Sequence, residues 1–393
     1  MKILIASGIY PPDIGGPAQY ARNLYETWKR AVDAQGKPLH EVKVAAYRWE
    51  RAFPPLVRHF LYFLKIIRKG WNADLILVLD TWSAAVPTMW ACKFMHKKYM
   101  VRTGGDFLWE SYVERTGDMV LFKDFYANRN SGKGNSEGGN MSDEKTDSAD
   151  HQNFLNKLSS KERLVHKLGG ASLRNASTVI FSTDWQKKIF AKEYDLDPKN
   201  CTIVENYCGE REAFTEPENR MFIAGTRSLK WKNINFLKEA FVEAQNELKR
   251  LNLPPVELDL GKAVYDSFVE KIRRSYAVIL VSLGDISPNM IFDAVGTGTP
   301  FIVTKENGIM HRISDAAVLV DPKSKKDIVD KIIWLADPKN RAEQARKVQA
   351  LSFKHSWKEI AGEIIKVHAL SASTVLPSAS LHSSSGEDFR LRA

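Results

Sequence analysis

Short runs of apolar residues recur along the chain and alternate with longer segments in which apolar residues repeat every three to four positions. Runs that are apolar throughout are typical of strands buried on both faces of a parallel sheet. The longer segments predict amphipathic helices. Their alternation predicts an α/β fold with doubly wound parallel sheets. The predicted strands lie within residues 3–7, 38–47, 73–80, 97–103, 179–183, 221–225, 256–262, 277–281, 301–304 and 318–322.

Two stretches interrupt this alternation and divide the chain. Residues 128–152 carry no apolar repeat and cannot bury enough surface to offset their ordering entropy, so we predict a disordered insertion. Residues 204–214 have the composition of a linker. We therefore predict a first domain of residues 1–205, a second domain of residues 206–350, a helix at 351–368 and a disordered Ser-rich tail at 369–393.

A basic amphipathic helix is predicted shortly after the second strand. The apolar residues of its repeat are Val57, Phe60, Leu61, Leu64 and Ile67, and its cations run from Arg58 to Lys69. Such a helix can pack on a sheet with its cations in water, or it can lie in an anionic membrane interface. We favour packing on the sheet and keep peripheral membrane contact as the alternative.

The clearest candidate chemistry lies between residues 282 and 304. Asp285 follows a predicted strand, and Asp293 lies eight residues later, inside a predicted helix. Ser287 is predicted to cap this helix, with Pro288 in its first turn and Asn289 just after it. The N-terminus of a helix attracts anions, and neighbouring carboxylates accept hydrogen bonds from sugar hydroxyls. The alternative is an ordinary capped helix with two solvated aspartates.

Other candidates follow the ends of other predicted strands. Gly15 and Gly16 allow a backbone to approach a ligand closely, although Gly-Gly also marks ordinary turns. Arg227 and Lys232 suit a diphosphate, unless they are merely solvated. Asp106 can contact a donor or an acceptor, or form a structural Asx-turn.

Composition restricts the remaining possibilities. The net charge of +10 and the pI near 9.2 favour acidic partners, but no nucleic-acid-binding motif is present, so we expect no nucleic-acid partner. The three cysteines have neither disulfide nor metal spacing, which fits a reducing compartment and a cytoplasmic location. The N-terminus has the pattern of a first strand and not of a signal peptide, and no stretch approaches the length of a membrane span.

The acidic pair with seven intervening residues, followed by AVGTGTP, resembles the motif of retaining glycosyltransferases with the GT-B fold, in family 4 or group 1. That resemblance implies two Rossmann-like domains facing a central cleft, with the last helix returning to the first domain. It implies hexosyl transfer from a nucleoside diphosphate sugar, with no metal or other cofactor. The acceptor would be a glycan, lipid-linked or surface molecule, and membrane contact would be peripheral, at the inner face.

The same resemblance assigns roles to the candidate residues. Asp285 would bind the donor sugar, and Asp293 the ribose. Arg227 and Lys232 would bind the diphosphate, and the glycine loop would border it. Here aspartates replace the family's usual glutamates, and Gly104, Gly105 and Asp106 stand where a histidine is common. Two alternatives remain open: a nucleotide-sugar epimerase or phosphorylase-like enzyme with this fold, and a catalytically silent sugar-nucleotide-binding or scaffold protein.

Overall fold

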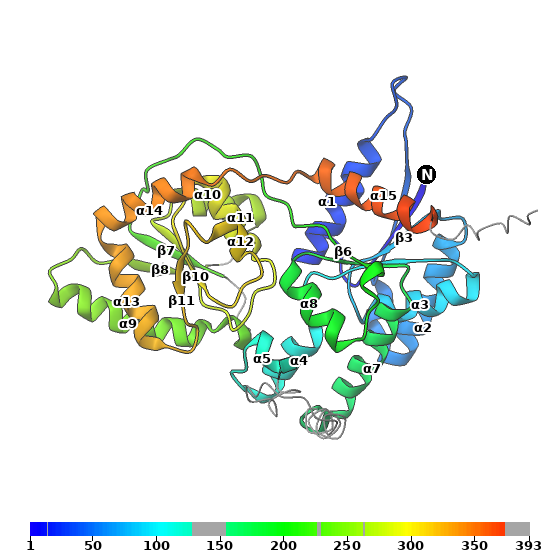
Figure 1. The fold of residues 1–393 in the computed structure, drawn as a ribbon, viewed down its shortest axis with the longest axis horizontal. Helices are drawn as coiled ribbons and strands as arrows, with labels where there is room; N and C mark the ends of the chain where they lie inside the picture. Colours follow the sequence, from blue (N-terminus) through cyan, green and yellow to red (C-terminus); the bar gives the residue numbers. More distant parts are fainter. Residues whose placement is uncertain (14, 128–154, 226–228, 262–263, 374–393) are drawn as a thin grey trace, which may run out of the picture.

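The computed structural model describes residues 1–13, 15–127, 155–225, 229–261 and 264–373, which form two lobes side by side (Figure 1). The first lobe contains a six-stranded parallel sheet with the order β2-β1-β3-β4-β5-β6. Its strands are β1 (Lys2–Ser7), β2 (Glu41–Ala46), β3 (Leu75–Val78), β4 (Met100–Arg102), β5 (Thr178–Phe181) and β6 (Cys201–Ile203).

Helices connect these strands. They are α1 (Gly16–Arg30), η1 (Trp49–Ala52), α2 (Pro55–Gly70), α3 (Ala85–Met95), α4 (Phe107–Thr116), α5 (Phe122–Ala127), α7 (Ser160–Arg174), α8 (Asp184–Glu193) and η2 (Pro198–Asn200). The predicted insertion at 128–152 lies outside the described residues. In the described part of this lobe, strands and helices alternate as the apolar pattern predicts.

The second lobe contains a five-stranded parallel sheet with the order β11-β10-β9-β7-β8. Its strands are β7 (Met221–Ala224), β8 (Glu257–Asp259), β9 (Ala277–Leu280), β10 (Phe301–Thr304) and β11 (Val318–Val320). Its helices are η3 (Lys230–Lys232), α9 (Ile234–Arg250), α10 (Tyr265–Arg274), α11 (Asn289–Thr297), α12 (Met310–Ile313), α13 (Lys325–Ala336) and α14 (Pro338–Ala350). The predicted domain boundary at residue 205 falls between β6 and β7.

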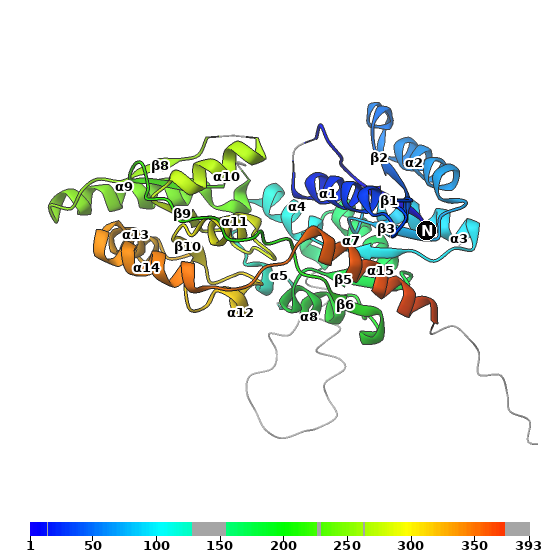
Figure 2. The ribbon, with the colours of Figure 1, turned by 90° about the horizontal axis from the view of Figure 1, so that it is seen from above.

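The last helix, α15 (Trp357–Ser373), crosses back and packs beside α1 of the first lobe (Figures 1 and 2). The Trp28 indole N–H donates to the Ala361 carbonyl at 3.3 Å, and the Trp357 ring stacks on Tyr207 with centroids 5.4 Å apart. The helix begins six residues later and ends five residues later than predicted, because Ser356 pairs with Glu359 at its start. Residues 369–373 are therefore helical, and residues 374–393 lie outside the described part.

The two lobes share an apolar contact. Trp109 of α4 packs against Trp231 of η3, with ring centroids 5.5 Å apart, and Trp231 and Leu283 belong to the same buried cluster as the first lobe's Phe122. The Lys123 ammonium also lies 2.6 Å from Glu306 across this contact. Helices α4 and α5 therefore hold the first lobe against the strand ends of the second.

Helix α2 is oriented differently from the favoured prediction. Tyr62 and Ile66 face the sheet and are fully buried, whereas Phe60 and Leu64 of the predicted apolar face are exposed. The reason is that this helix has apolar residues on two sides, and Tyr62 donates a hydrogen bond to the buried Ala45 carbonyl at 2.8 Å. Within the described residues, no helix has the length and apolarity needed to span a bilayer.

Candidate functional site

Asp285 and Lys232 form an ion pair at the carboxyl ends of neighbouring strands. Asp285 follows β9, and Lys232 ends the short helix after β7. The Lys232 Nζ lies 2.6 Å from Asp285 Oδ2, and the two side chains are only 15% and 11% exposed. The Ser282 hydroxyl donates to the same carboxylate oxygen at 3.3 Å. The charge of Lys232 is therefore balanced within the protein.

The loop that carries Asp285 is held by backbone hydrogen bonds from three directions. The Leu283 N–H donates to the Trp231 carbonyl at 2.9 Å, and the Asp285 N–H donates to the Glu306 carbonyl at 2.8 Å. From the first lobe, the Phe122 N–H donates to the Leu283 carbonyl at 3.2 Å. The position of the Asp285 carboxylate therefore depends on both lobes.

Ser287 does not cap the following helix, which corrects the prediction. The helix α11 begins at Asn289, and Pro288 in an extended conformation occupies the capping position without a side-chain hydrogen bond. The Ser287 hydroxyl is buried and has no hydrogen-bond partner among the described residues. The backbone bonds of the Asp285 loop keep this segment extended and delay the start of the helix. A buried hydroxyl without a partner beside Asp285 is a candidate for contact with a ligand.

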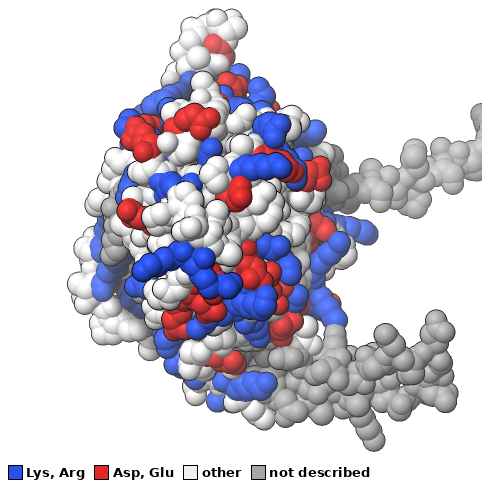
Figure 3. All heavy atoms as spheres, turned by 90° about the vertical axis from the view of Figure 1, so that its left-hand side faces the viewer, with Lys and Arg blue, Asp and Glu red and all other residues white. Residues whose placement is uncertain are grey.

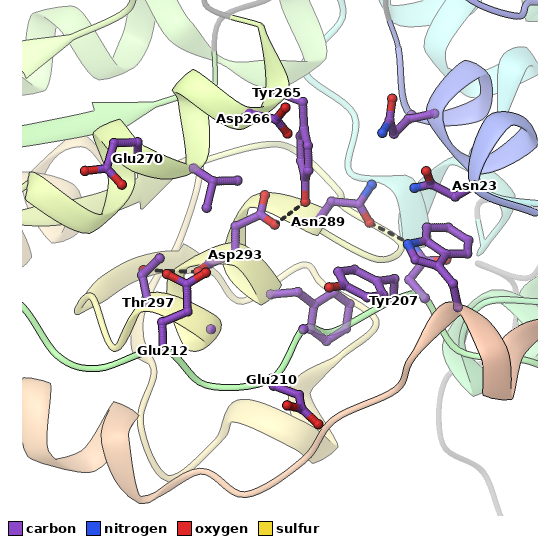
Figure 4. Close-up of a pocket in the computed structure, with 18 of the residues that line it drawn as sticks. Asn23, Tyr207, Glu210, Glu212, Tyr265, Asp266, Glu270, Asn289, Asp293 and Thr297 are labelled. Carbon is purple, nitrogen blue, oxygen red and sulfur yellow. Dashed lines mark hydrogen bonds between the residues drawn. The ribbon is translucent and has the colours of Figure 1, made fainter. Parts of the chain in front are cut away.

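Asp293 lies about one turn into α11 and lines a cavity of about 500 Å³ between the lobes (Figure 4). The Tyr265 hydroxyl, at the start of α10, donates to Asp293 Oδ1 at 2.8 Å. Burial raises the pKa of Asp293 to about 6, and the Tyr265 hydrogen bond opposes that rise. A carboxylate in this position can accept further hydrogen bonds from ligand hydroxyls.

Among the charged residues that line the cavity, carboxylates predominate. Arg273 is the single Lys or Arg among the described lining residues, and it pairs with Glu212 and Glu270. Such a lining suits hydroxyl donors and repels a phosphate group. The lining carboxylates are Glu210, Glu212, Asp266, Glu270 and Asp293, all labelled in Figure 4.

The cavity also joins the glycine loop of the first lobe to α11. The Asn206 amide donates to Asn289 Oδ1 at 2.9 Å, and Asn206 in turn accepts a hydrogen bond from the buried Arg102 guanidinium. Gly16 lies beside Asn289, since a Cβ on Gly16 would be 3.7 Å from the Asn289 amide nitrogen. Gly15 has a φ of +153°, a conformation that favours glycine. The glycine loop therefore lies beside the start of α11.

Asp106 has a structural position. It is the N-cap of α4, where its carboxylate accepts hydrogen bonds from the Leu108 and Trp109 N–H groups. Its second oxygen accepts a hydrogen bond from the Tyr126 hydroxyl. The side chain is buried, and burial raises its pKa to about 6. Of the two predicted alternatives, the geometry favours the structural turn over contact with a substrate.

The candidate residues therefore form two groups. Gly16, Asn289 and Asp293 line the cavity, whereas the buried Asp285 and Ser287 and the partly buried Lys232 lie at the strand ends, outside its lining. Arg227 lies outside the described residues. No cluster of three His, Cys, Asp or Glu side chains suited to a metal ion occurs in the described part of the chain, and independence from metal stays a prediction.

Several lining residues were not predicted from the sequence. Tyr265 is the most important, because it is the hydrogen-bond partner of Asp293. Its place just beyond a strand's carboxyl end, the same signal that singled out Asp285, could have found it. Tyr207 and Trp357 come from the two segments that cross between the lobes, and no local pattern marks them as neighbours.

A second cavity, of about 470 Å³, lies in the first lobe at the carboxyl ends of β1, β3 and β4. Its lining is largely apolar and includes Trp82, with Arg58 and His59 contributed by α2. The Tyr47 hydroxyl and His59 Nδ1 are hydrogen-bonded at 2.7 Å, and burial lowers the pKa of His59. A partly apolar ligand would suit this lining.

Two facing parallel sheets with a returning final helix define the GT-B fold, and this chain has that fold. No family model matches the sequence, and a search of curated proteins finds no match either. Similar solved structures include sucrose-phosphate synthase from Thermosynechococcus elongatus (TM-score 0.61, 13% identity, covering 95% of this chain and 99% of that one).

Two further structures support the same comparison. HepE from Anabaena, solved in complex with UDP, gives a TM-score of 0.55 at 14% identity and covers 95% of this chain and 99% of its own. The UDP-forming α,α-trehalose-phosphate synthase from Burkholderia vietnamiensis gives 0.58 at 10% identity and covers 95% of this chain and 100% of its own. At these identities the likeness shows the fold alone.

Proposed function

We propose that this protein is a retaining glycosyltransferase of the family 4 type, a hexosyltransferase that uses a nucleoside diphosphate sugar. The observation that carries the proposal is the pairing of Lys232 with Asp285 at adjacent strand ends, just before the helix that carries Asp293 into the cavity between the lobes. Open parallel sheets bind ligands at this edge. The similar solved structures, one of them holding UDP, favour a sugar nucleotide as the ligand.

The acidic cavity is proposed to hold the hydroxyl-rich part of the donor. Asp293, positioned by Tyr265, would accept hydrogen bonds from the ribose hydroxyls. The diphosphate would lie outside this acidic lining, at Lys232 and the N-terminal end of α11, where positive charge and free N–H groups are offered. Arg227 is proposed to join them, and Gly15 and Gly16 to border the same groups.

Lys232 is proposed to exchange partners when the donor binds. A diphosphate carries more negative charge than Asp285 and would take the ammonium group, which releases the Asp285 carboxylate to bind the hydroxyls of the sugar. As the bond between the anomeric carbon and the phosphate oxygen breaks, Lys232 would stabilise the growing charge on the leaving diphosphate. The acceptor oxygen would bond to the same face of that carbon, and its proton would pass to the departing phosphate.

The acceptor is proposed to be a glycan or a lipid-linked molecule bound in the first-lobe cavity. A lipid-linked acceptor requires peripheral membrane contact, for which the helix carrying Arg58 and Lys69 is the candidate element.

All three cysteines are buried and unpaired, which supports a reducing, cytoplasmic location.

A panel of UDP-, GDP- and ADP-sugars tests the proposal. We expect one nucleotide class to raise the melting temperature and to release its nucleoside diphosphate in the presence of an acceptor. Tight binding without turnover would instead support a silent sugar-nucleotide-binding protein. The shorter aspartates in place of the family's glutamates, and Gly104, Gly105 and Asp106 where a histidine is common, favour that second candidate function.

The variant Asp293→Asn should gain stability while losing donor affinity. The folded protein keeps the Asp293 proton to about pH 6, whereas the unfolded chain releases it near the ordinary pKa of 3.8, so ionised Asp293 destabilises the fold as the pH rises through this range. The amide removes that penalty. Thermal unfolding should show a higher melting temperature than wild type at about pH 7.5 and a nearly equal one at about pH 4.5.

Donor binding by the same variant provides the second measurement. Titration calorimetry should show affinity for the donor reduced by roughly tenfold, because an amide accepts hydroxyl hydrogen bonds less strongly than a carboxylate. Tyr265→Phe is the companion variant, and it should reduce the affinity for the donor less than Asp293→Asn does. Unchanged donor affinity in Asp293→Asn would remove this residue from the ribose site.

A further inference from the structure

Helix α2 turns apolar side chains toward the solvent. Leu56, Phe60 and Leu64 are 85%, 59% and 44% exposed, and their spacing of four residues places them on one face of the helix. The opposite face buries Tyr62 and Ile66 against the sheet. A helix of a soluble domain normally keeps such a stripe inside, so this exposed face needs an explanation.

The exposed stripe is part of a larger apolar surface. Phe60 stacks on Phe63 with centroids 6.1 Å apart, and Phe63 contacts Phe94 of α3 edge to face at 6.4 Å. The short helix η1 packs on α2 and adds two more exposed aromatic rings. We call this surface the α2–α3 ridge. Its exposed members are Trp49, Phe53, Leu56, Val57, Phe60, Leu64, Trp90 and Phe94.

The α2 and α3 segments of the ridge carry positive charge without negative charge, and Glu50 of η1 is buried and paired with Lys65. Residues 51–73 and 81–105, which include α2 and α3, contain no Asp or Glu. The exposed Arg68 lies on α2, and the Lys93 ammonium lies 5.1 Å from the centre of the Trp90 ring. By contrast, the face at the second-lobe end of the molecule shows Lys and Arg interspersed with Asp and Glu (Figure 3).

The polar side of α2 completes the amphipathic arrangement. Lys65 and Lys69 turn toward the sheet edge, where they donate to the Ala46 and Val44 carbonyls at 2.9 and 2.6 Å. Together with Arg48 and Arg68 they line a groove of about 690 Å³ along β2. An exposed apolar face flanked by cations is the pattern of a helix that lies in a bilayer interface.

We propose that the α2–α3 ridge inserts into the headgroup region of an anionic lipid bilayer, with α2 parallel to the membrane plane. A second copy of this chain is a poorer occupant, because it would bring two acid-free, positively charged surfaces together. An anionic bilayer supplies both the apolar layer and the compensating charge. The inference deepens the acceptor part of the proposed function: Arg58 and His59, from the same helix, line the first-lobe cavity, which would then open beside the lipid surface.

Sedimentation with vesicles tests the inference on the full chain. Wild type should sediment with vesicles of phosphatidylcholine and phosphatidylglycerol and remain in solution with phosphatidylcholine alone. The double variant Leu56→Ser/Phe60→Ser should bind the anionic vesicles at least about tenfold more weakly, because two large apolar side chains no longer leave water. Val242→Ser is the matched control, since Val242 of the second lobe is 65% exposed and should not affect binding.

Two further measurements separate the possible outcomes. Arg68→Glu should also weaken vesicle binding, and high salt should do the same. Without vesicles, the double variant and wild type should release nucleoside diphosphate at equal rates. This assay therefore reports on sugar transfer, and sedimentation reports separately on lipid binding. The inference is overturned if wild type ignores anionic vesicles, if the double variant binds them equally well, or if gel filtration shows a dimer that only the double variant loses.

Discussion

Asp285→Asn is expected to lower the rate of sugar transfer by about 100- to 1,000-fold, the usual effect of removing one positioned electrostatic group. The carboxylate is nearly buried, and its position is fixed by backbone bonds from both lobes, so it is preorganised for the sugar. Steady-state release of nucleoside diphosphate measures the loss. Turnover near the wild-type rate would show that Asp285 takes no part in the reaction.

The same variant should not lose affinity for the free nucleoside diphosphate. With the carboxylate gone, Lys232 has no anionic partner at 2.6 Å and is more available to a phosphate. Titration calorimetry with the nucleoside diphosphate of the active donor should therefore show equal or tighter binding. A marked loss of affinity for the nucleoside diphosphate would contradict the partner exchange at Lys232. The sugar-binding role of Asp285 would still be tested by the rate of turnover.

Asp330→Asn is the matched control for Asp285→Asn. Asp330 is paired with Lys326 at the same 2.6 Å distance, but the two side chains are 53% and 85% exposed. Exposed pairs contribute little to stability, and this one is remote from the strand ends of the site. Its loss should leave turnover and melting temperature unchanged, whereas Asp285→Asn should also lower the melting temperature because Lys232 stays nearly buried without its partner.

Gly308→Ala is expected to destabilise the contact between the lobes. A Cβ at this position would overlap with the Ile286 carbonyl oxygen and lie 2.7 Å from the Thr183 hydroxyl of the first lobe. Overpacking of this kind costs about 1–3 kcal/mol, which corresponds to a fall in melting temperature of roughly 3–10 °C. Turnover should fall too, because the Gly308 N–H donates to the Asp285 carbonyl at 3.1 Å.

Gly362→Ala supplies the comparison for this effect. Gly362 lies in α15, and a Cβ there meets no atom within 4 Å. Alanine is the better helix former by about 0.5–1 kcal/mol, so differential scanning calorimetry should show an unchanged or higher melting temperature. Equal melting temperatures for Gly308→Ala and wild type would mean that the chain around Ile286 and Thr183 yields to the added methyl group.

The strands could be predicted from the sequence because they are short apolar runs buried on both faces. Residues 301–304 were predicted as a strand and form β10 with the same bounds. The start of α11 could not be predicted in this way. Ser287 and Pro288 have the composition of a helix start, but bonds from Trp231, Glu306 and Phe122 fix the Asp285 loop, and the helix begins only at Asn289. Contacts between distant segments overrode the local signal.

The orientation of α2 was missed for a related reason. Its sequence offers two apolar sides, and the residues alone do not say which side the sheet covers. Tyr62 decides the matter through its hydrogen bonds to backbone carbonyls of β1 and β2. For Asp106 the sequence left two roles open, and the bonds it accepts from the Leu108 N–H and the Tyr126 hydroxyl favour the structural one.

The two segments that cross between the lobes are themselves paired: Cys208 and His355 exchange backbone hydrogen bonds at 2.9 and 3.0 Å. The chain thus crosses between the lobes twice, and its two crossing segments lie side by side. A motion of one lobe against the other would therefore have to bend both crossing segments together. The first lobe cannot be produced as a single uninterrupted fragment: truncation before residue 357 would expose the surface around Trp28, so a separate first lobe would need α15 rejoined to it.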